Sequence, residues 1–344
     1  MSALARRVEE TDYFRRSPAP LGGPGGHKEW QHFLVHAPGL EVLVNFSLGD
    51  EHRLDGRPGV EAGRVIVVVR AGDAHQGVVE RVADEGLEVR GGRVDARFGA
   101  SSLRFVEGAW QVQVALPGLA IRLRVRPETW PAVSSNIPLG PGRQLSWLIV
   151  PRAVADGEVV VDGRRHVIRG ALAYHDHNWG HFQWGDDFAW EWGQAVPADV
   201  GCPWSVVFVR MADRRRTRVA TQGLLLWRGA DQRRVFRDRD VAVETGPPLD
   251  VAGAFKLPPV MALLAPEASG DVPAWLEATA AADGDHLRLR FDATHVAQIL
   301  IPDETDPLGV TRLNEVSGPV RLAGVVGGER VELTGPAVFE FVRG

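Results

Sequence analysis

Apolar and polar residues alternate at a period of two in many short stretches of this chain. The segments 41–48, 110–116 and 121–126 each place an apolar side chain at every second position. This pattern is typical of strands that bury one face. The dipeptide Asp162-Gly163 predicts a tight turn between strands at 159–161 and 166–168. Further strands are expected at 204–210, 217–227, 286–291 and 331–341.

Glycine and proline are abundant, with 39 glycines and 23 prolines among 344 residues. This composition favours many turns over long helices. Only the segment 273–282 is a candidate for a short helix. The segments 127–144 and 246–275 are rich in proline or glycine and are expected to form long loops, as surface loops or as walls of a binding site. The sequence therefore predicts a mostly antiparallel all-β protein.

Composition excludes several classes of protein. A formal charge of −5 argues against nucleic acid as a partner. The single cysteine, Cys202, excludes an intramolecular disulfide. Residues 1–16 carry charges throughout, unlike a signal peptide, and no run approaches the roughly 18 apolar residues of a membrane span. We therefore expect a cytoplasmic protein.

A weak internal repeat is visible at an offset of about half the chain. The segment 162–174 resembles 327–339, because two glycines seven residues apart frame a strand and an aromatic residue follows four residues later. Trp30 and Trp190 would then open the two halves. A true repeat predicts two barrel-like halves in tandem. Coincidence among glycine-rich hairpins is the alternative.

One short segment concentrates the groups that transfer protons. Residues 173–181 read Ala-Tyr-His-Asp-His-Asn-Trp-Gly-His. On a strand, Tyr174, Asp176 and Asn178 share one face, and His175, His177 and Trp179 share the other. A carboxyl group in an apolar, tryptophan-lined site can stay protonated at neutral pH, which makes Asp176 a candidate general acid.

Tyr174 could hold a water molecule or an anionic intermediate, and His177 completes the candidate catalytic set. The alternative is a buried polar network that pins two strands together. The spacing of His175, His177 and His181 also suits a metal site, but the intervening Asn-Trp-Gly suggests a turn. The glycines at 22–26 lack the flanking pattern of a phosphate loop. We therefore expect neither a metal nor another cofactor.

Five of the eleven tryptophans lie within 26 residues: Trp179, Trp184, Trp190, Trp192 and Trp204. Their large apolar rings could line a site for a long hydrocarbon or fused-ring ligand, and the face of an indole ring stabilises a cation. Filling of a barrel core is the alternative.

These motifs together resemble a known superfamily. They comprise His27-x-Glu29-Trp30, Val161-Asp162-Gly163, Gly170-x-x-x-Tyr174-x-Asp176-His177-x-Trp179-Gly180 and a closing Gly335-x-x-x-Phe339-Glu340. The combination resembles the hydroxyneurosporene synthase (carotenoid hydratase) and AttH-like superfamily. That group is similar in turn to lipocalin-like Diels–Alderases.

The resemblance implies two tandem lipocalin-like (calycin) antiparallel β-barrels, with an N-terminal extension at 1–26, a first barrel at 27–183 and a second at 184–344. It also implies that Tyr174 and Asp176 form the acid pair. Leu145 departs from the hydratase pattern, which has a histidine there, so the named substrate does not transfer with the fold. The residues expected to contact substrate are Trp30, Trp147, Asn178, Trp179, Trp190 and Trp192.

The expected function is a cofactor-independent lyase or cyclase that hydrates or cyclises a hydrophobic polyene, terpenoid or polyketide. The expected partners are this small molecule and, for its uptake, a transient contact with a membrane surface. A Diels–Alderase-like pericyclase and a carrier without chemistry are the alternatives.

Overall fold

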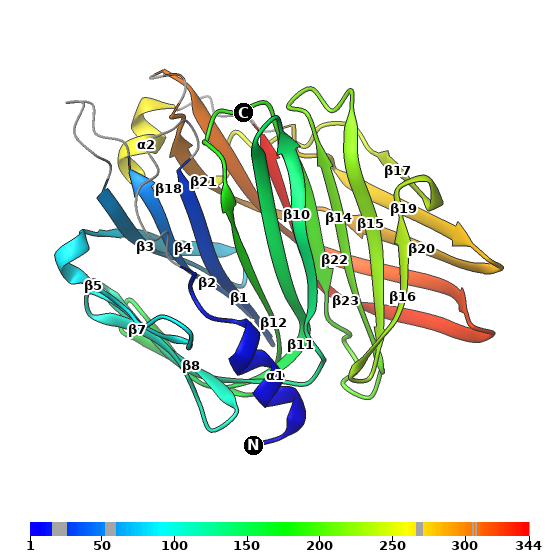
Figure 1. The fold of residues 1–344 in the computed structure, drawn as a ribbon, viewed down its shortest axis with the longest axis horizontal. Helices are drawn as coiled ribbons and strands as arrows, with labels where there is room; N and C mark the ends of the chain where they lie inside the picture. Colours follow the sequence, from blue (N-terminus) through cyan, green and yellow to red (C-terminus); the bar gives the residue numbers. More distant parts are fainter. Residues whose placement is uncertain (16–25, 52–59, 266–270, 305, 307, 344) are drawn as a thin grey trace. The chain divides into compact units, whose positions relative to one another are not determined.

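The computed structural model of this chain consists of two β-sheets and a few short helices (Figure 1). It describes residues 1–15, 26–51, 60–265, 271–304, 306 and 308–343. The chain divides into two compact units, Met1–Gln183 and Trp184–Gly344, and each unit contains one sheet. Within the described ranges, all strand pairs are antiparallel except that of β18 with β21. The prediction of an all-β, antiparallel fold is confirmed.

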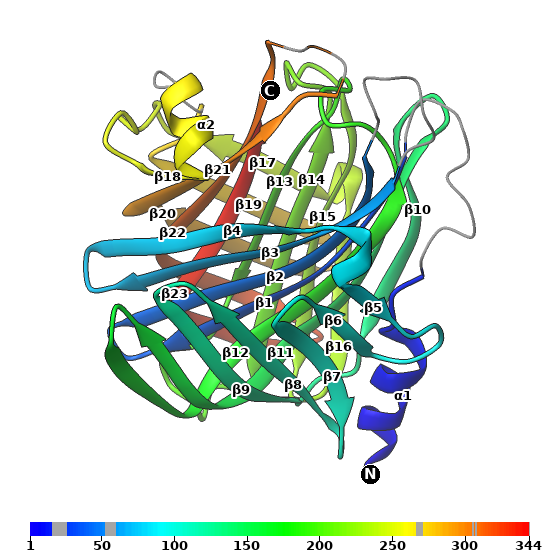
Figure 2. The ribbon, with the colours of Figure 1, turned by 90° about the vertical axis from the view of Figure 1, so that its left-hand side faces the viewer.

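The first unit holds a sheet ordered β4-β3-β2-β1-β12-β11-β9-β8-β7-β6-β5, and β10 pairs with β11. Figure 2 shows β1 to β4 on one side of this curled sheet and β7 to β9 on the other. Its elements are α1 (Ala3–Thr11), β1 (His27–Ala37), β2 (Leu40–Glu51), β3 (Val60–Ala71), β4 (Ala74–Val82), the 3-10 turn η1 (Asp84–Gly86), β5 (Leu87–Val89), β6 (Asp95–Phe98), β7 (Ser101–Val106), β8 (Ala109–Leu116), β9 (Leu119–Pro127), β10 (Ala132–Gly140), β11 (Arg143–Val161) and β12 (Arg164–His181).

The first sheet curls until its two ends almost meet. A Cβ atom on Gly63 of β3 would lie 2.4 Å from Leu87 Cδ2 and 2.7 Å from Phe98 Cδ1, which belong to the opposite end of the sheet. Only a glycine allows this close approach. The sheet is therefore a nearly closed barrel, as expected for a lipocalin-like unit.

The second unit is organised in the same way, in the order β16-β15-β14-β13-β23-β22-β20-β19-β17, with β21 beside β22 and β18 beside β21. Its elements are β13 (Ala189–Ala195), β14 (Trp204–Ala212), β15 (Val219–Arg228), β16 (Asp231–Arg237), the 3-10 turn η2 (Asp238–Asp240), β17 (Val241–Thr245), β18 (Phe255–Leu257), α2 (Pro259–Leu264), β19 (Trp275–Ala282), β20 (Asp285–Asp292), β21 (His295–Pro302), β22 (Val310–Val326) and β23 (Glu329–Arg343).

The hydrophobic cores follow from the alternation in the sequence. In β9, buried Ile121, Leu123 and Val125 alternate with exposed arginines. Each unit has its own cluster of inward-facing residues, with Phe33 and Trp110 in the first and Phe339 in the second. The burial of these large side chains drives the curling of each sheet.

Each half of the chain has an equivalent hairpin at the centre of its own sheet. Hairpin β11–β12 turns at Asp162-Gly163 and hairpin β22–β23 turns at Gly327-Gly328, and all four residues have positive φ, as a type I′ turn requires. β12 lies between β1 and β11, and β23 lies between β13 and β22. The repeat seen in the sequence therefore corresponds to a repeated topology.

A β-bulge makes the repeated hairpins differ. Ala155 pairs with Ala171 but Gly157 pairs with Ile168, so β12 contains one extra residue at this point. Gly170 takes φ +59° there, and a glycine allows this left-handed conformation without strain. Hairpin β22–β23 runs without such a shift. The bulge shifts by one residue the alternation of core-facing and outward-facing side chains along β12. Tyr174 therefore points away from the core, whereas Phe339, its counterpart in the sequence repeat, lies in the core.

Three sequence predictions differ from the structure. The segment 273–282, the candidate helix, contains strand β19, in which Leu276, Ala278 and Ala280 alternate toward the core between β17 and β20. The predicted loop at 127–144 contains β10, and the predicted loop at 246–275 contains the short strand β18 and helix α2. For β19 and β10, pairing with neighbouring strands outweighs local propensity.

The N-terminal helix α1 was not predicted, because its apolar face is limited to a few residues. Ser2 caps it by accepting a hydrogen bond from Ala5 N at 3.1 Å, and Ala5 and Val8 are buried. Among the described helices, none is long and apolar enough to cross a membrane.

Candidate active site

Strand β12 presents two chemically different faces. His175 and His177 point into the core of the first unit, where His175 stacks on Phe33 with ring centroids 4.3 Å apart. Tyr174, Asp176 and Asn178 lie on the opposite face, as the alternation predicts.

Tyr174, Asp176 and Asn178 form a hydrogen-bonded row. The Tyr174 hydroxyl donates to Asp176 Oδ2 over 2.9 Å, and Asn178 Nδ2 donates to Asp176 Oδ1 over 2.9 Å. The exposed fractions of the three residues are 0%, 5% and 6%. A carboxyl group buried this deeply needs such partners. They fix the orientation of both carboxyl oxygens of Asp176.

Strands β1 and β11 flank this row and add aromatic and polar side chains to the same face. His32 of β1 pairs with Asp176. Trp30 of β1 and Trp147 of β11 pair with Asn178 from its two sides. Directly paired residues of antiparallel strands share a face. Three predicted contact residues, Trp30, Trp147 and Asn178, are therefore brought beside the acid pair.

The other predicted contact residues lie elsewhere. Trp179 is on the core side of β12, where the Arg15 guanidinium lies 3.5 Å from its ring centroid. Trp190 and Trp192 belong to β13 of the second unit, where Trp190 Nε1 donates to Glu340. Leu145, which pairs with Gly180, keeps an apolar side chain on the face of Asp176.

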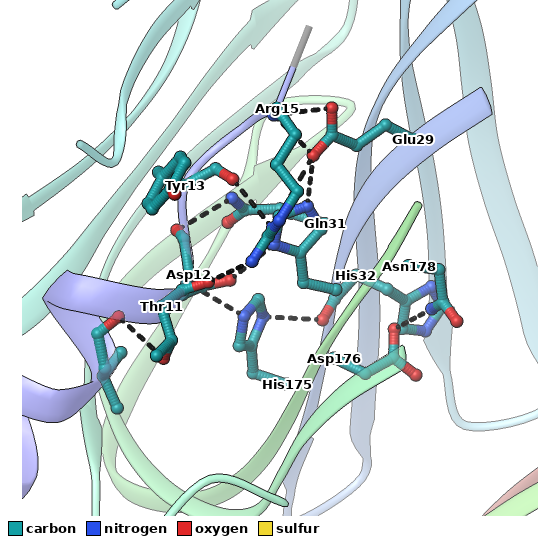
Figure 3. A network of polar contacts seen from close by, with 12 residues as sticks. Thr11, Asp12, Tyr13, Arg15, Glu29, Gln31, His32, His175, Asp176 and Asn178 are labelled. Atoms are coloured by element: carbon teal, nitrogen blue, oxygen red, sulfur yellow. Dashed lines mark hydrogen bonds and ion pairs between the residues drawn. The ribbon is translucent and has the colours of Figure 1, made fainter. Parts of the chain in front are cut away.

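On the core face, the residue after helix α1 joins two histidines. Asp12 Oδ2 lies 3.1 Å from His175 Nε2 (Figure 3), and it accepts the Trp110 indole hydrogen bond at 2.7 Å. Asp12 Oδ1 lies 2.9 Å from His177 Nδ1. All four side chains have an exposed fraction of 0%. The N-terminal segment is thus tied to the strand that carries Asp176.

Glu29 of β1 extends this network. Its Oε1 lies 2.8 Å from His177 Nε2 and its Oε2 lies 3.0 Å from His27 Nε2. The backbone N–H of Arg15 donates to both Glu29 oxygens at 2.8 Å. Two carboxylates therefore enclose His177, and the N-terminal segment is bound at Asp12 and again at Arg15.

The electrostatics show that the network is ionic. Burial alone would lower the pKa of His177, but hydrogen bonds and charges of Asp12 and Glu29 outweigh it and raise that pKa. Burial alone would raise the pKa of Asp12, but His175 and His177 hold it well below its usual range. This environment favours the protonated form of His177, whose two ring nitrogens are both occupied. His177 lies on the face opposite Asp176.

The pKa of His32 is shifted in the opposite direction from that of His177. Burial, aided by the nearby charge of His175, lowers the pKa of His32 from 6.5 to about 3. The ring is therefore neutral at physiological pH, on the same face as Asp176 and paired with it.

This shift predicts a pH dependence of stability. Between pH 6.5 and 3, His32 is protonated in the unfolded chain but neutral in the folded chain. The free energy of unfolding should therefore fall as the pH is lowered through this interval. In His32→Gln this contribution is absent, and urea unfolding at a series of pH values should show a shallower slope than in the wild type. Equal slopes in the two proteins would contradict the shift.

A second buried acid lies in the second unit. Glu340 of β23 pairs with Glu315 of β22, and a side-chain hydrogen bond joins them. Burial raises the pKa of Glu340, although this bond and the one from Trp190 oppose the rise. The surroundings of Glu340 therefore favour its protonated form.

Two of the three histidines whose spacing suits a metal, His175 and His177, contact the two oxygens of the Asp12 carboxylate. Among the residues that the structure describes, no three or more His, Cys, Asp or Glu side chains are arranged to hold a metal ion.

Sequence reasoning missed three residues of this region. Asp12 precedes His175 by 163 residues, and no local pattern connects them. Glu29 was noticed only as part of a motif. For His32 the sequence does contain an indication, because alternation along β1 places it on one face with Trp30 and Leu34. These three residues pair with Asn178, Asp176 and Tyr174, with His32 opposite Asp176.

Comparison with known proteins identified the fold but no family. No family model matches the chain, and no curated protein matches it significantly. Three similar solved structures cover nearly all of it. AttH from Nitrosomonas europaea has a TM-score of 0.60 at 11% identity, covering 95% of this chain and 96% of its own. CghA, in complex with Sch210972, has a TM-score of 0.59 at 14% identity, covering 93% and 89%.

Kievitone hydratase from Nectria haematococca has a TM-score of 0.56 at 12% identity, covering 96% of this chain and 95% of its own. At such identities the matches establish a shared fold. They confirm the tandem AttH-like architecture that the motifs predicted.

Proposed function

We propose that this protein is a cofactor-independent acid–base enzyme that hydrates or cyclises a hydrophobic polyene, terpenoid or polyketide. The observation that carries the proposal is the row of Tyr174, Asp176 and Asn178, whose hydrogen bonds orient a buried carboxyl group. The fold shared with a hydratase supports it.

In this proposal Asp176 is the proton donor. A protonated Asp176 transfers its proton to an alkene carbon or a polarised carbonyl, and the remaining carboxylate accepts the hydrogen bonds of Tyr174 and Asn178. Those bonds strengthen as negative charge develops, so they favour the transition state over the ground state.

The flanking indole rings would stabilise the cation that forms after proton transfer. Trp30 and Trp147 pair with Asn178, which lies on the same face as Asp176 and two residues from it along β12. A carbocation formed beside Asp176 would be stabilised by the faces of such rings. Capture of this cation by water gives an alcohol, and capture by a second alkene of the substrate gives a ring.

His177 has a different role in this proposal. Its ring nitrogens are bound to Asp12 and Glu29, so neither nitrogen is available for proton exchange with a substrate. We assign His177 to hold β12 in place from the core side.

The function is tested with alkenes of three classes. The full chain is incubated separately with kievitone, the polyene lycopene and the terpenoid farnesol in isotopically labelled water, and products are identified by mass spectrometry. We expect a product heavier by one labelled water, or a cyclic isomer, from at least one compound. Saturable binding without turnover of any compound would indicate a carrier and contradict the proposal.

A further inference from the structure

A buried histidine of β1 lies directly across from the candidate acid. His32 pairs with Asp176 in the antiparallel register of β1 and β12, and with Asn45 on β2. Its exposed fraction is 5%, the same as that of Asp176. Figure 3 shows His32, Asp176 and Asn178 near one another, and a dashed line joins His32 to His175 of the Asp12 network.

The core network fixes the backbone at this histidine. His175 Nδ1 lies 3.0 Å from the His32 carbonyl oxygen, and His175 is held in turn by Asp12. Directly opposed residues have Cβ atoms about 5 Å apart. From such positions an imidazole and a carboxyl group can both reach a single water molecule.

The neutral state of the His32 ring suits it to relay a proton. In either tautomer of a neutral imidazole, one ring nitrogen carries a proton and the other can accept one. A histidine whose pKa lies near 3 accepts a proton from a strongly acidic oxonium ion and readily passes it to a carboxylate. His177 cannot perform this step, because both of its ring nitrogens are held by carboxylates.

We propose that His32 is a further catalytic residue that deprotonates the attacking water. The inference rests on the proposed function and assigns it to hydration. Asp176 gives its proton to one alkene carbon, where the π electron pair forms the new C–H bond. The water oxygen bonds to the other carbon, and His32 takes a proton from that oxygen and returns it to the Asp176 carboxylate. The net reaction adds one water and requires no oxidant or reductant.

The test uses whichever compound among kievitone, lycopene and farnesol the wild type hydrates, with deuterium oxide as solvent. Two quantities are measured: the rate of alcohol formation and the entry of deuterium into recovered alkene. His32→Gln and His32→Asn should lower alcohol formation by about 10²-fold. Deuterium should still enter the recovered alkene, because Asp176 continues to protonate it and the cation reverts. Asp176→Asn should lose both.

The matched control is His36→Gln, since His36 is another buried histidine of β1 and lies four residues from His32 on the same face. It should leave both quantities within about threefold of wild type. If both His32 variants also form alcohol at that rate while Asp176→Asn does not, His32 has no catalytic role and the proposed function stands. A parallel loss of alcohol and of deuterium entry would show that His32 only shapes the site. A wild type that hydrates none of the compounds would overturn this inference, and the proposed function falls too if no cyclic isomer forms.

Discussion

Replacement of Asp176 by asparagine should lower turnover by about 10²-fold or more and leave the fold intact. The amide has nearly the shape of the carboxyl group and keeps one oxygen to accept a hydrogen bond from Tyr174 or Asn178. It cannot deliver a proton. The measurement is the steady-state rate with a compound that the wild type converts, with circular dichroism as the check on folding.

The control for this variant is Asp162→Asn. Asp162 is an exposed acid in the turn that precedes β12, and its φ of +45° suits asparagine equally well. Its turnover should equal that of the wild type. If folded Asp176→Asn also turned over at nearly the wild-type rate, Asp176 would have no part in the chemistry. A pericyclase, which relies mainly on shape, would then be the better description.

The second large effect is expected on stability. Asp12→Asn should lower the free energy of unfolding of the first unit by roughly 3–5 kcal/mol, because it removes one charge from a buried ionic network and leaves the His177 imidazolium undercompensated. The change also weakens the hydrogen bonds of Asp12 with His175 and Trp110. Urea unfolding at neutral pH, followed by tryptophan fluorescence, measures the loss.

Glu10→Gln provides the comparison, since it removes an exposed carboxylate two residues away on α1. Its effect should stay within about 0.5 kcal/mol. A loss below about 1 kcal/mol for Asp12→Asn would mean that the network does not hold the N-terminal segment on β12.

Local patterns in the sequence determined the class of fold and the composition of the polar row. A strand has a side-chain period of two, so the spacing of Tyr174, Asp176 and Asn178 places them on one face wherever that strand lies. The Asp162-Gly163 turn was predictable for a similar reason, because few dipeptides adopt two consecutive positive φ angles. The repeat of hairpins was visible through the same turn residues.

Tertiary structure alone decided which face of β12 meets the core. The bulge at Gly170 shifts the alternation by one residue, and the sequence repeat therefore matches Tyr174 with a core residue, Phe339, although the two face opposite ways. The sequence around a glycine in a strand does not show whether the glycine forms a bulge, since this depends on the partner strand.

The side chains that contact β12 could not be predicted from local sequence patterns either. Asp12 reaches His175 and His177 across more than 160 residues, and His32 meets Asp176 only because β1 and β12 become neighbours in the sheet. Local sequence sets the period of a strand, but strand order and register set which side chains meet. Local sequence therefore specifies the row of Tyr174, Asp176 and Asn178, whereas the ionic network behind this row and the histidine beside it follow from the order and register of the strands.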